Sequence, residues 1–216
     1  MKYSNLTGIN NLYLIIVLAL SGTSLYAMLH ENLEHSLITA CKFGNNSIVE
    51  YILTLKDHDL QSPLNINCID KEGQRPLSIA SSLGYEKIVE MLLENGANPD
   101  IADTDSYAPL HFASLNQNKE IVALLLKQNA NPDIMTQYQY TPLHFAACNG
   151  NIDIVRLLLE YGANRLLATP YGETALDFAM DDNHNTHNEI VKILDPNVEF
   201  SPSLTAHCFI RISYKG

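Results

Sequence analysis

The chain has 216 residues, and its 13 basic and 24 acidic side chains give a formal net charge of −11. Hydrophobic residues make up 46% and charged residues 17%, which argues against a disordered chain, a collagen-like chain or a coiled coil. The acidic balance disfavours nucleic acids and anionic lipid surfaces, because clustered Lys and Arg bind both. Four cysteines are too few for a fold built on disulfide bonds.

Residues 1–27 have the order of features found in a secretory signal peptide. Lys2 is the only charge before Glu31, and an apolar run over residues 12–20 is followed by small and polar residues that lead to Ala27. The run is too short to cross a bilayer, which takes about 20 apolar residues. We expect cleavage after Ala27 and a secreted or periplasmic mature protein that no longer contacts a membrane.

The alternative for this segment is an uncleaved membrane anchor. Residues 12–29 approach membrane length only if the polar residues 21–24 are included. In that case the protein would be a membrane-tethered scaffold.

Two sequence markers recur along the rest of the chain with a period near 33 residues. Ile-Val begins at residues 48, 88, 121, 154 and 190, and Leu-x-x-Ala begins at residues 37, 77, 110, 143 and 176. Because two independent markers agree, the pattern predicts five repeated units, of which the first and last are irregular. Their expected bounds are 28–71, 72–104, 105–137, 138–170 and 171–200, and residues 201–216 form a tail that fits a strand, a cap or a disordered end equally.

Each unit has the pattern of two helices. Residues 121–126 place their apolar side chains on one broad helical face. A shorter helix precedes it and begins at Thr141-Pro142, where Thr is expected to cap the free amides and Pro suits the first helical position. An extended hairpin should lead to the next unit. Residues that tolerate the left-handed conformation are expected to end the second helices, and these are Gly96, Asn129 and Gly162.

Residues 141–146, Thr-Pro-Leu-His-Phe-Ala, are similar to the signature of ankyrin repeats, and residues 108–113 depart from it at one place. The resemblance covers roughly residues 31–200. It implies an all-α ankyrin-repeat solenoid, in which paired antiparallel helices are joined by β-hairpin-like loops. It also implies a monomeric module that binds a protein partner on a concave face. We expect no catalytic site, no metal and no cofactor.

The departures from the family pattern have physical consequences. Ser106 and Gln139 stand where the family has a hairpin Gly, and a side chain in the left-handed region costs about 1–2 kcal/mol, so these hairpins should be strained. Seven extra residues lie in the long loop of the first unit, around residues 57–63. Three further extra residues lie within residues 181–189, in the last unit. The second helix of that unit, which ends at Asp195, is expected to be short.

The candidate chemical residues favour structural roles. His111 and His144 are one period apart, or about 8–10 Å, which is too far to share a substrate or an ion. The resemblance implies that both make structural hydrogen bonds near the hairpins. His184 and His187 lie among acidic residues and could ligate a metal, but the segment is rich in Asn and is expected to be a solvated loop.

The four cysteines leave two disulfide pairings open. These are Cys41 with Cys68, and Cys148 with Cys208. We favour small buried side chains over either pairing, because Cys68 aligns with Ile101, Ile134 and Leu167 at a core position of the repeat.

The resemblance also implies where a partner binds: at the hairpin tips and at the end of each first helix. The four tip tyrosines suit recognition, although their rings could instead cover neighbouring hairpins. We expect a partner with an apolar patch edged with basic groups. A secreted bacterial effector that binds host proteins is one form of this hypothesis. The predicted binding residues are Phe43, Leu83, Asp105, Tyr107, Leu115, Asn116, Tyr138, Tyr140, Asn149 and Tyr171.

Overall fold

The computed structural model describes residues 23–55, 64–180 and 185–195, with the backbone alone for residues 23–32 and 185–187. These ranges contain ten α-helices and a single isolated β-bridge, between Ala168 and Thr174. The predicted all-α solenoid is therefore confirmed. The helices are α2 (Thr23–Lys42), α3 (Asn46–Thr54), α4 (Pro76–Leu83), α5 (Glu86–Glu94), α6 (Pro109–Leu115), α7 (Lys119–Lys127), α8 (Pro142–Cys148), α9 (Ile152–Glu160), α10 (Ala175–Met180) and α11 (Asn185–Leu194).

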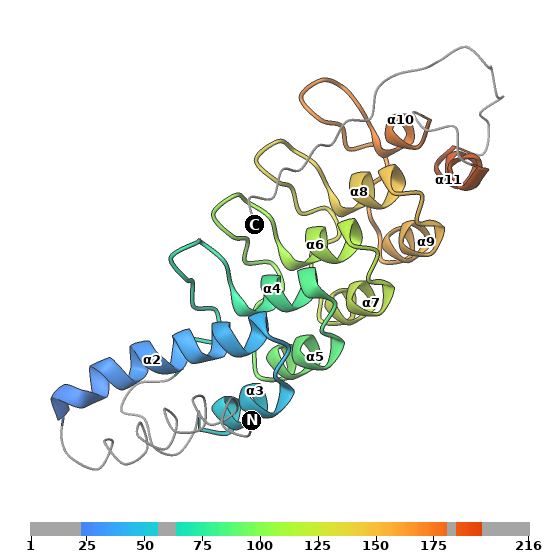
Figure 1. The fold of residues 1–216 in the computed structure, drawn as a ribbon. Coiled ribbons are helices and arrows are strands. Elements are labelled where there is room, and N and C mark those ends of the chain that lie inside the picture. The colour runs from blue at the N-terminus through green and yellow to red at the C-terminus, as the bar shows by residue number, and fades with distance from the viewer. Residues whose placement is uncertain (1–22, 56–63, 181–184, 196–216) are drawn as a thin grey trace, which may run out of the picture.

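The helices form two rows (Figure 1). The first row contains α2, α4, α6, α8 and α10, and the second contains α3, α5, α7, α9 and α11. Each first-row helix packs on the second-row helix that follows it in the chain and on its neighbours in its own row. Long loops project from the first row, on the side away from the second row. The result is an elongated stack of helix pairs with loops along one side.

Proline begins three first-row helices, as predicted. Pro142 stands at the first helical position of α8, and Pro76 and Pro109 do the same in α4 and α6. Thr141 caps the start of α8 as predicted, but it does so together with His144: the two residues form a capping box, in which the Thr141 hydroxyl also bonds the Nδ1 atom of His144 at 2.8 Å. His144 turns back over the helix start, where its Nδ1 accepts the Thr141 N–H at 3.0 Å.

Left-handed residues end the second-row helices, as predicted. Gly96, Asn129 and Gly162 have φ of 86°, 60° and 88°. At Asn129 a side chain occupies this region, and Asn is among the few residues that visit it routinely. These turns reverse the chain and direct it into the loop toward the next helix pair.

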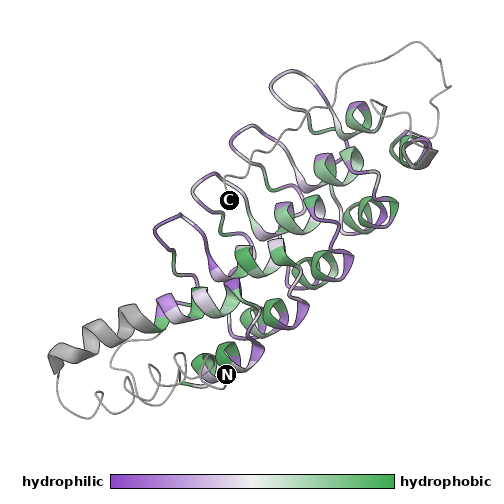
Figure 2. Ribbon diagram, in the orientation of Figure 1, coloured by the Kyte–Doolittle hydropathy of each residue, from purple (hydrophilic) through white to green (hydrophobic). Residues whose placement is uncertain are grey.

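The core runs the length of the stack between the two rows. The repeated Ile-Val and Leu-x-x-Ala residues supply it, and Ile121, Val122 and Leu125 are fully buried. Figure 2 shows the apolar residues gathered where the two rows of helices meet. Each helix pair therefore completes its core only by packing against its neighbours, as in other repeat proteins.

The loops between helix pairs are hairpins with a common hydrogen-bond pattern. In the second loop the N–H of Asp103 donates to the Tyr107 carbonyl at 3.0 Å, and the N–H of Ser106 donates to the Asp103 carbonyl at 3.1 Å. The same two bonds recur over residues 70–74, 136–140 and 169–173. Ser106 and Gln139 have φ of 65° and 61°, so the predicted left-handed conformation at both positions is confirmed.

Two predictions about the last helix pair are wrong. Helix α11 covers Asn185–Leu194 and has 10 residues, so it is not short. It also includes residues 185–187, which were expected to be loop. Burial of Ile190, Val191 and Leu194 against the stack stabilises this helix although its first turn is polar.

Several sequence predictions fall on residues that the structure does not describe. The predicted apolar run of the signal peptide, the insertion at 57–63, His184 and the tail at 201–216 all lie outside the described residues. The predicted cleavage point after Ala27 falls in the first turns of α2. Within the described ranges, no helix combines the length and the apolar character needed to cross a bilayer.

Candidate protein-binding face

The four hairpins and the first-row helices form one continuous surface, which we call the inner face. Each hairpin lies beside the carboxyl end of the preceding first-row helix. For example, Lys42 at the end of α2 contacts the first hairpin, and Ser82 near the end of α4 borders a cavity that also touches the second hairpin. All ten predicted binding residues lie at hairpin tips or at the ends of first-row helices.

Four of these residues present large side chains to solvent. Phe43 is 79% exposed, Leu83 50%, Tyr138 58% and Tyr171 86%. Exposed aromatic and aliphatic side chains on one face are common at protein–protein interfaces. The structure therefore places apolar contact area at both ends and in the middle of the inner face.

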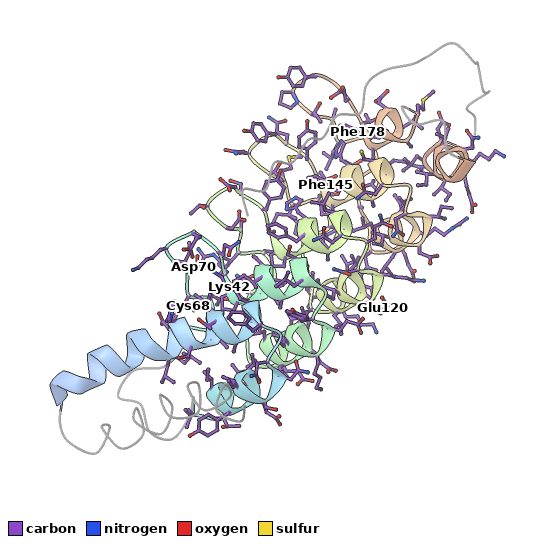
Figure 3. All side chains as sticks on the ribbon, in the orientation of Figure 1. Lys42, Cys68, Asp70, Glu120, Phe145 and Phe178 are labelled. Carbon is purple, nitrogen blue, oxygen red and sulfur yellow. The ribbon has the colours of Figure 1, made fainter. Side chains whose placement is uncertain are left out.

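Tyr107 and Tyr140 are instead half-buried in a column of aromatic rings. Tyr107 lies 5.6 Å from Phe112 and 6.0 Å from Phe145, measured between ring centroids. Tyr140 lies 5.9 Å from Phe145 and 5.8 Å from Phe178. Phe145 and Phe178 are on successive first-row helices (Figure 3), so the column links three helix pairs. Both tyrosines stabilise the hairpins, and their contact with a partner stays a prediction.

The two predicted structural histidines complete this column. The Nδ1 atom of His111 accepts the Ala108 N–H at 3.0 Å, which leaves its proton on Nε2. Nε2 donates to the carbonyl of Ile134 at 2.9 Å, in the loop that enters the next hairpin. His144 donates in the same way to the Glu173 carbonyl at 3.3 Å. Burial lowers the pKa of His111 to about 4 and also lowers the pKa of His144. The implied structural role of both histidines is confirmed.

The remaining predicted residues are partly engaged within the stack. The Nδ2 of Asn116 donates to the Ser82 carbonyl at 2.8 Å, and the Nδ2 of Asn149 donates to the Leu115 carbonyl at 2.6 Å. Each bond joins neighbouring first-row helices. Leu115 is half-buried, whereas Asp105 is exposed at the second hairpin tip.

Sequence reasoning missed two apolar residues on this face. Ile69 and Met135 are exposed, and each immediately precedes the first residue of a hairpin turn. Both occupy the same position of the repeat, one residue before Asp70 and Thr136. An apolar residue that recurs at this tip-flanking position was the signal that could have identified them.

Most of the charged side chains at the hairpin tips lie in the amino-terminal half of the inner face. The Nζ of Lys42 lies 2.8 Å from the Oδ2 of Asp70 and 3.3 Å from the Oε2 of Glu72. Figure 3 shows Lys42 and Asp70 side by side. The second tip carries Asp103 and Asp105, whereas the third, over residues 136–140, has no ionisable side chain except those of two tyrosines.

The described residues contain no group of three or more His, Cys, Asp or Glu side chains that could hold a metal ion. Cys41 and Cys68 are buried free thiols, and burial raises the pKa of each to about 12. Such thiols stay protonated and are poor nucleophiles. The preference for small buried side chains is thus confirmed for these two, and Cys208 lies outside the described residues.

A family model described as "Ankyrin repeats (3 copies)" matches residues 9–105 and 110–202, which together are most of the chain. No curated protein matches the sequence.

Proposed function

The chain belongs to the ankyrin repeat family, and we propose that it is a non-catalytic module that binds a protein partner on its inner face. Ankyrin repeats are generally protein–protein interaction modules and are typically not enzymes. The proposal assigns one ankyrin repeat to each of the helix pairs, which gives five repeats.

The observation that carries this proposal is the set of exposed apolar side chains on the inner face. Phe43, Leu83, Tyr138 and Tyr171 are all at least half exposed, and they come from the ends of two first-row helices and from two hairpins. Burying these side chains at a dry interface would favour association, by about 25 cal/mol for each Å² of apolar surface. A partner that covers them needs an apolar patch. Because the chain carries a net charge of −11, the rim of that patch should be basic.

The test compares affinity capture by the full chain and by a variant with Tyr138→Ala and Tyr171→Ala. Both rings are exposed, so the variant should fold as the parent does. The control is Lys127→Ala, on the exposed side of α7 in the second row. A partner should be retained by the parent and the control and be lost from the double variant. If all three chains retain the same proteins, the inner face is not the binding surface.

We also propose that the protein comes from a bacterium and is exported, with residues 1–27 as a cleaved signal peptide. The support is Lys2 and the apolar run at 12–20, followed by small residues up to Ala27. Frequent Asn, Ile and Tyr residues fit an AT-rich genome. Mass spectrometry of the natural protein should then find Met28 at its amino terminus. Full-length chain in a carbonate-resistant membrane pellet would instead favour the tethered scaffold, and recovery outside the cell, bound to host protein, would favour the effector.

A further inference from the structure

Equivalent positions in successive repeats differ at one polar site of the inner face. Lys42 and Ser82 are equivalent, because each lies five residues after the Leu of the Leu-x-x-Ala marker. Asp70 and Asp103 are equivalent as the first residues of hairpin turns with the same hydrogen bonds. The repeat thus keeps the carboxylate in the second hairpin but replaces the lysine with serine.

In the first of these repeats, the carboxylates of Asp70 and Glu72 bind the ammonium group of Lys42. The Nζ of Lys42 bridges Asp70 at 2.8 Å and Glu72 at 3.3 Å. Burial alone would raise the pKa of Asp70, but the hydrogen bonds from Lys42 and from the Gln74 backbone outweigh it, so the pKa lies below its usual range. The chain itself therefore binds one lysine between two carboxylates of a hairpin tip.

The second repeat has the carboxylates of Asp103 and Asp105 but no lysine at the position equivalent to Lys42. Asp105 stands where Glu72 stands, two residues after the first turn residue. Among the described residues, no Lys or Arg forms an ion pair with Asp103. The nearby Arg75 guanidinium donates instead to the backbone carbonyls of Asn67 and Ala102.

The carboxylate of Asp103 therefore has different hydrogen-bond partners and a different pKa shift from the carboxylate of Asp70. One oxygen of Asp103, Oδ1, accepts the N–H groups of Asp105 at 3.0 Å and Tyr107 at 2.8 Å. Burial nevertheless raises the pKa of Asp103, and the charge of Asp105 adds to the rise, against a smaller opposing effect of the Arg75 charge. A cation beside Asp103 would remove this penalty, as Lys42 does at Asp70.

A small cavity lies next to Asp103 at this point. Its volume is about 30 Å³, which is enough room for a group the size of a water molecule. Ser78 contributes to its wall, is 3% exposed, and has a buried Oγ with no hydrogen-bond partner among the described residues. Buried hydroxyls rarely stay unpaired in folded proteins. The full lining is Gln74, Ser78, Ile79, Ser82, Asp103 and Phe112.

We infer that this cavity receives the ammonium group of a lysine side chain from the protein partner, held by Asp103 and the Ser78 hydroxyl. The inference rests on the proposed binding function and names the chemistry of one contact. An ammonium is a compact group with three donors, whereas an arginine head is a wide planar fork. The small cavity suits the compact group, and Lys42 shows that the chain already uses an ammonium at the equivalent place.

The test selects binders from a display library of random twelve-residue peptides on the full chain. The selected peptides should share a lysine at one position. Replacing that lysine with norleucine should weaken binding about tenfold or more, as expected for a charged hydrogen bond. The same replacement should have little effect on binding to the Asp103→Asn chain, which couples the peptide lysine to this carboxylate.

A second variant supplies the cation from within the chain. Ser82→Lys places a lysine where Lys42 stands, so it should lower the pKa of Asp103 in an NMR titration and remove the lysine preference from the selection. Ser82→Met is the matched control, because it fills the cavity without charge and should leave the pKa of Asp103 high.

The outcomes separate the two proposals. Peptides that depend on Tyr138 and Tyr171 but carry no preferred lysine, or carry arginine there, would overturn the ammonium site and leave the proposed function standing. An unchanged Asp103 pKa in Ser82→Lys would also overturn the ammonium site. Failure to select any peptide that depends on the inner face would contradict the proposed function, and the lysine contact with it.

Discussion

Tyr140 packs edge-on against Phe178 of the following helix pair, with ring centroids 5.8 Å apart and ring planes at 88°. Tyr140 comes from a hairpin and Phe178 from α10, so a loop and a helix of different pairs share one aromatic contact. Edge-to-face pairs of this kind contribute about 0.5–1.5 kcal/mol beyond the area they bury. The hairpin is thereby fixed to the helices.

The first prediction concerns the two kinds of tyrosine on the inner face. Tyr140→Ala should lower the free energy of unfolding by about 2 kcal/mol, because it removes ring contacts with Phe145 and Phe178. Tyr171→Ala should change it by less than about 0.5 kcal/mol, because that ring is 86% exposed. Urea unfolding followed by circular dichroism measures both. Equal losses in the two variants would show that the aromatic column does not stabilise the stack.

The second prediction concerns how stability is distributed along the stack. The pairs α6–α7 and α8–α9 should show the slowest amide hydrogen exchange, because the aromatic column joins them and they have neighbours on both sides. The pair α10–α11 should open first, because described helices contact it on one side only, as they do α2–α3, and because α10 is the shortest described helix, with 6 residues. Exchange measured by mass spectrometry on peptic fragments tests this order. Uniform protection of all the helix pairs would contradict it.

Local features of the fold could be predicted from the sequence because each depends on neighbouring residues. Pro142 sets the start of α8 through its own fixed φ, and Asn129 ends a helix through its tolerance of the left-handed region. The Asn-rich start of α11 was misread as loop. Its helical state depends on Ile190 and Val191, which are buried against the stack after the polar turn.

The candidate site was less predictable, since exposure depends on contacts between repeats. The pattern assigned Tyr107 and Tyr138 to the same surface, yet Tyr107 packs on Phe145 of the next repeat and Tyr138 stays exposed. The Leu-x-x-Ala marker likewise makes Lys42 and Ser82 equivalent positions. Only the side-chain positions in the structure show that Lys42 reaches Asp70.

The third prediction concerns the hairpin residues with positive φ. Ser106→Gly and Gln139→Gly should each raise the free energy of unfolding by about 1 kcal/mol, since glycine adopts φ near 65° and 61° without strain. Thermal and urea unfolding would measure the gain. No gain in either variant would mean that the hairpins relax around the side chains.

The reverse change in the other two hairpins serves as a control. Gly172→Ala should lose about 1 kcal/mol from backbone strain alone, because no atom lies within 4 Å of the new methyl group. Gly73→Ala should lose more, because its Cβ would overlap the side chain of Thr104 as well.

The fourth prediction concerns acid sensitivity caused by His111. Burial lowers its pKa from 6.5 to about 4 in the folded chain, so between these values the unfolded chain binds a proton that the folded chain does not. Stability is therefore complete above pH 6.5 and falls as the pH drops toward 4, by about 3 kcal/mol over the whole range. His144, whose pKa is also lowered, acts in the same direction.

The measurement compares urea unfolding of the parent and of His111→Asn at pH 7 and pH 5. The parent should lose about 2 kcal/mol more than the variant between these two values, because the variant lacks the titrating ring. His35→Asn is the matched control, because it makes the same change at an exposed position of α2 and keeps the buried His111 ring, so the loss that comes from His111 should persist. An NMR titration of the parent gives the folded pKa of His111 directly, without relying on the stability of any variant. A midpoint near 6.5 would contradict the prediction, because a ring with Nδ1 bonded to Ala108 and Nε2 bonded to Ile134 should resist protonation at that pH.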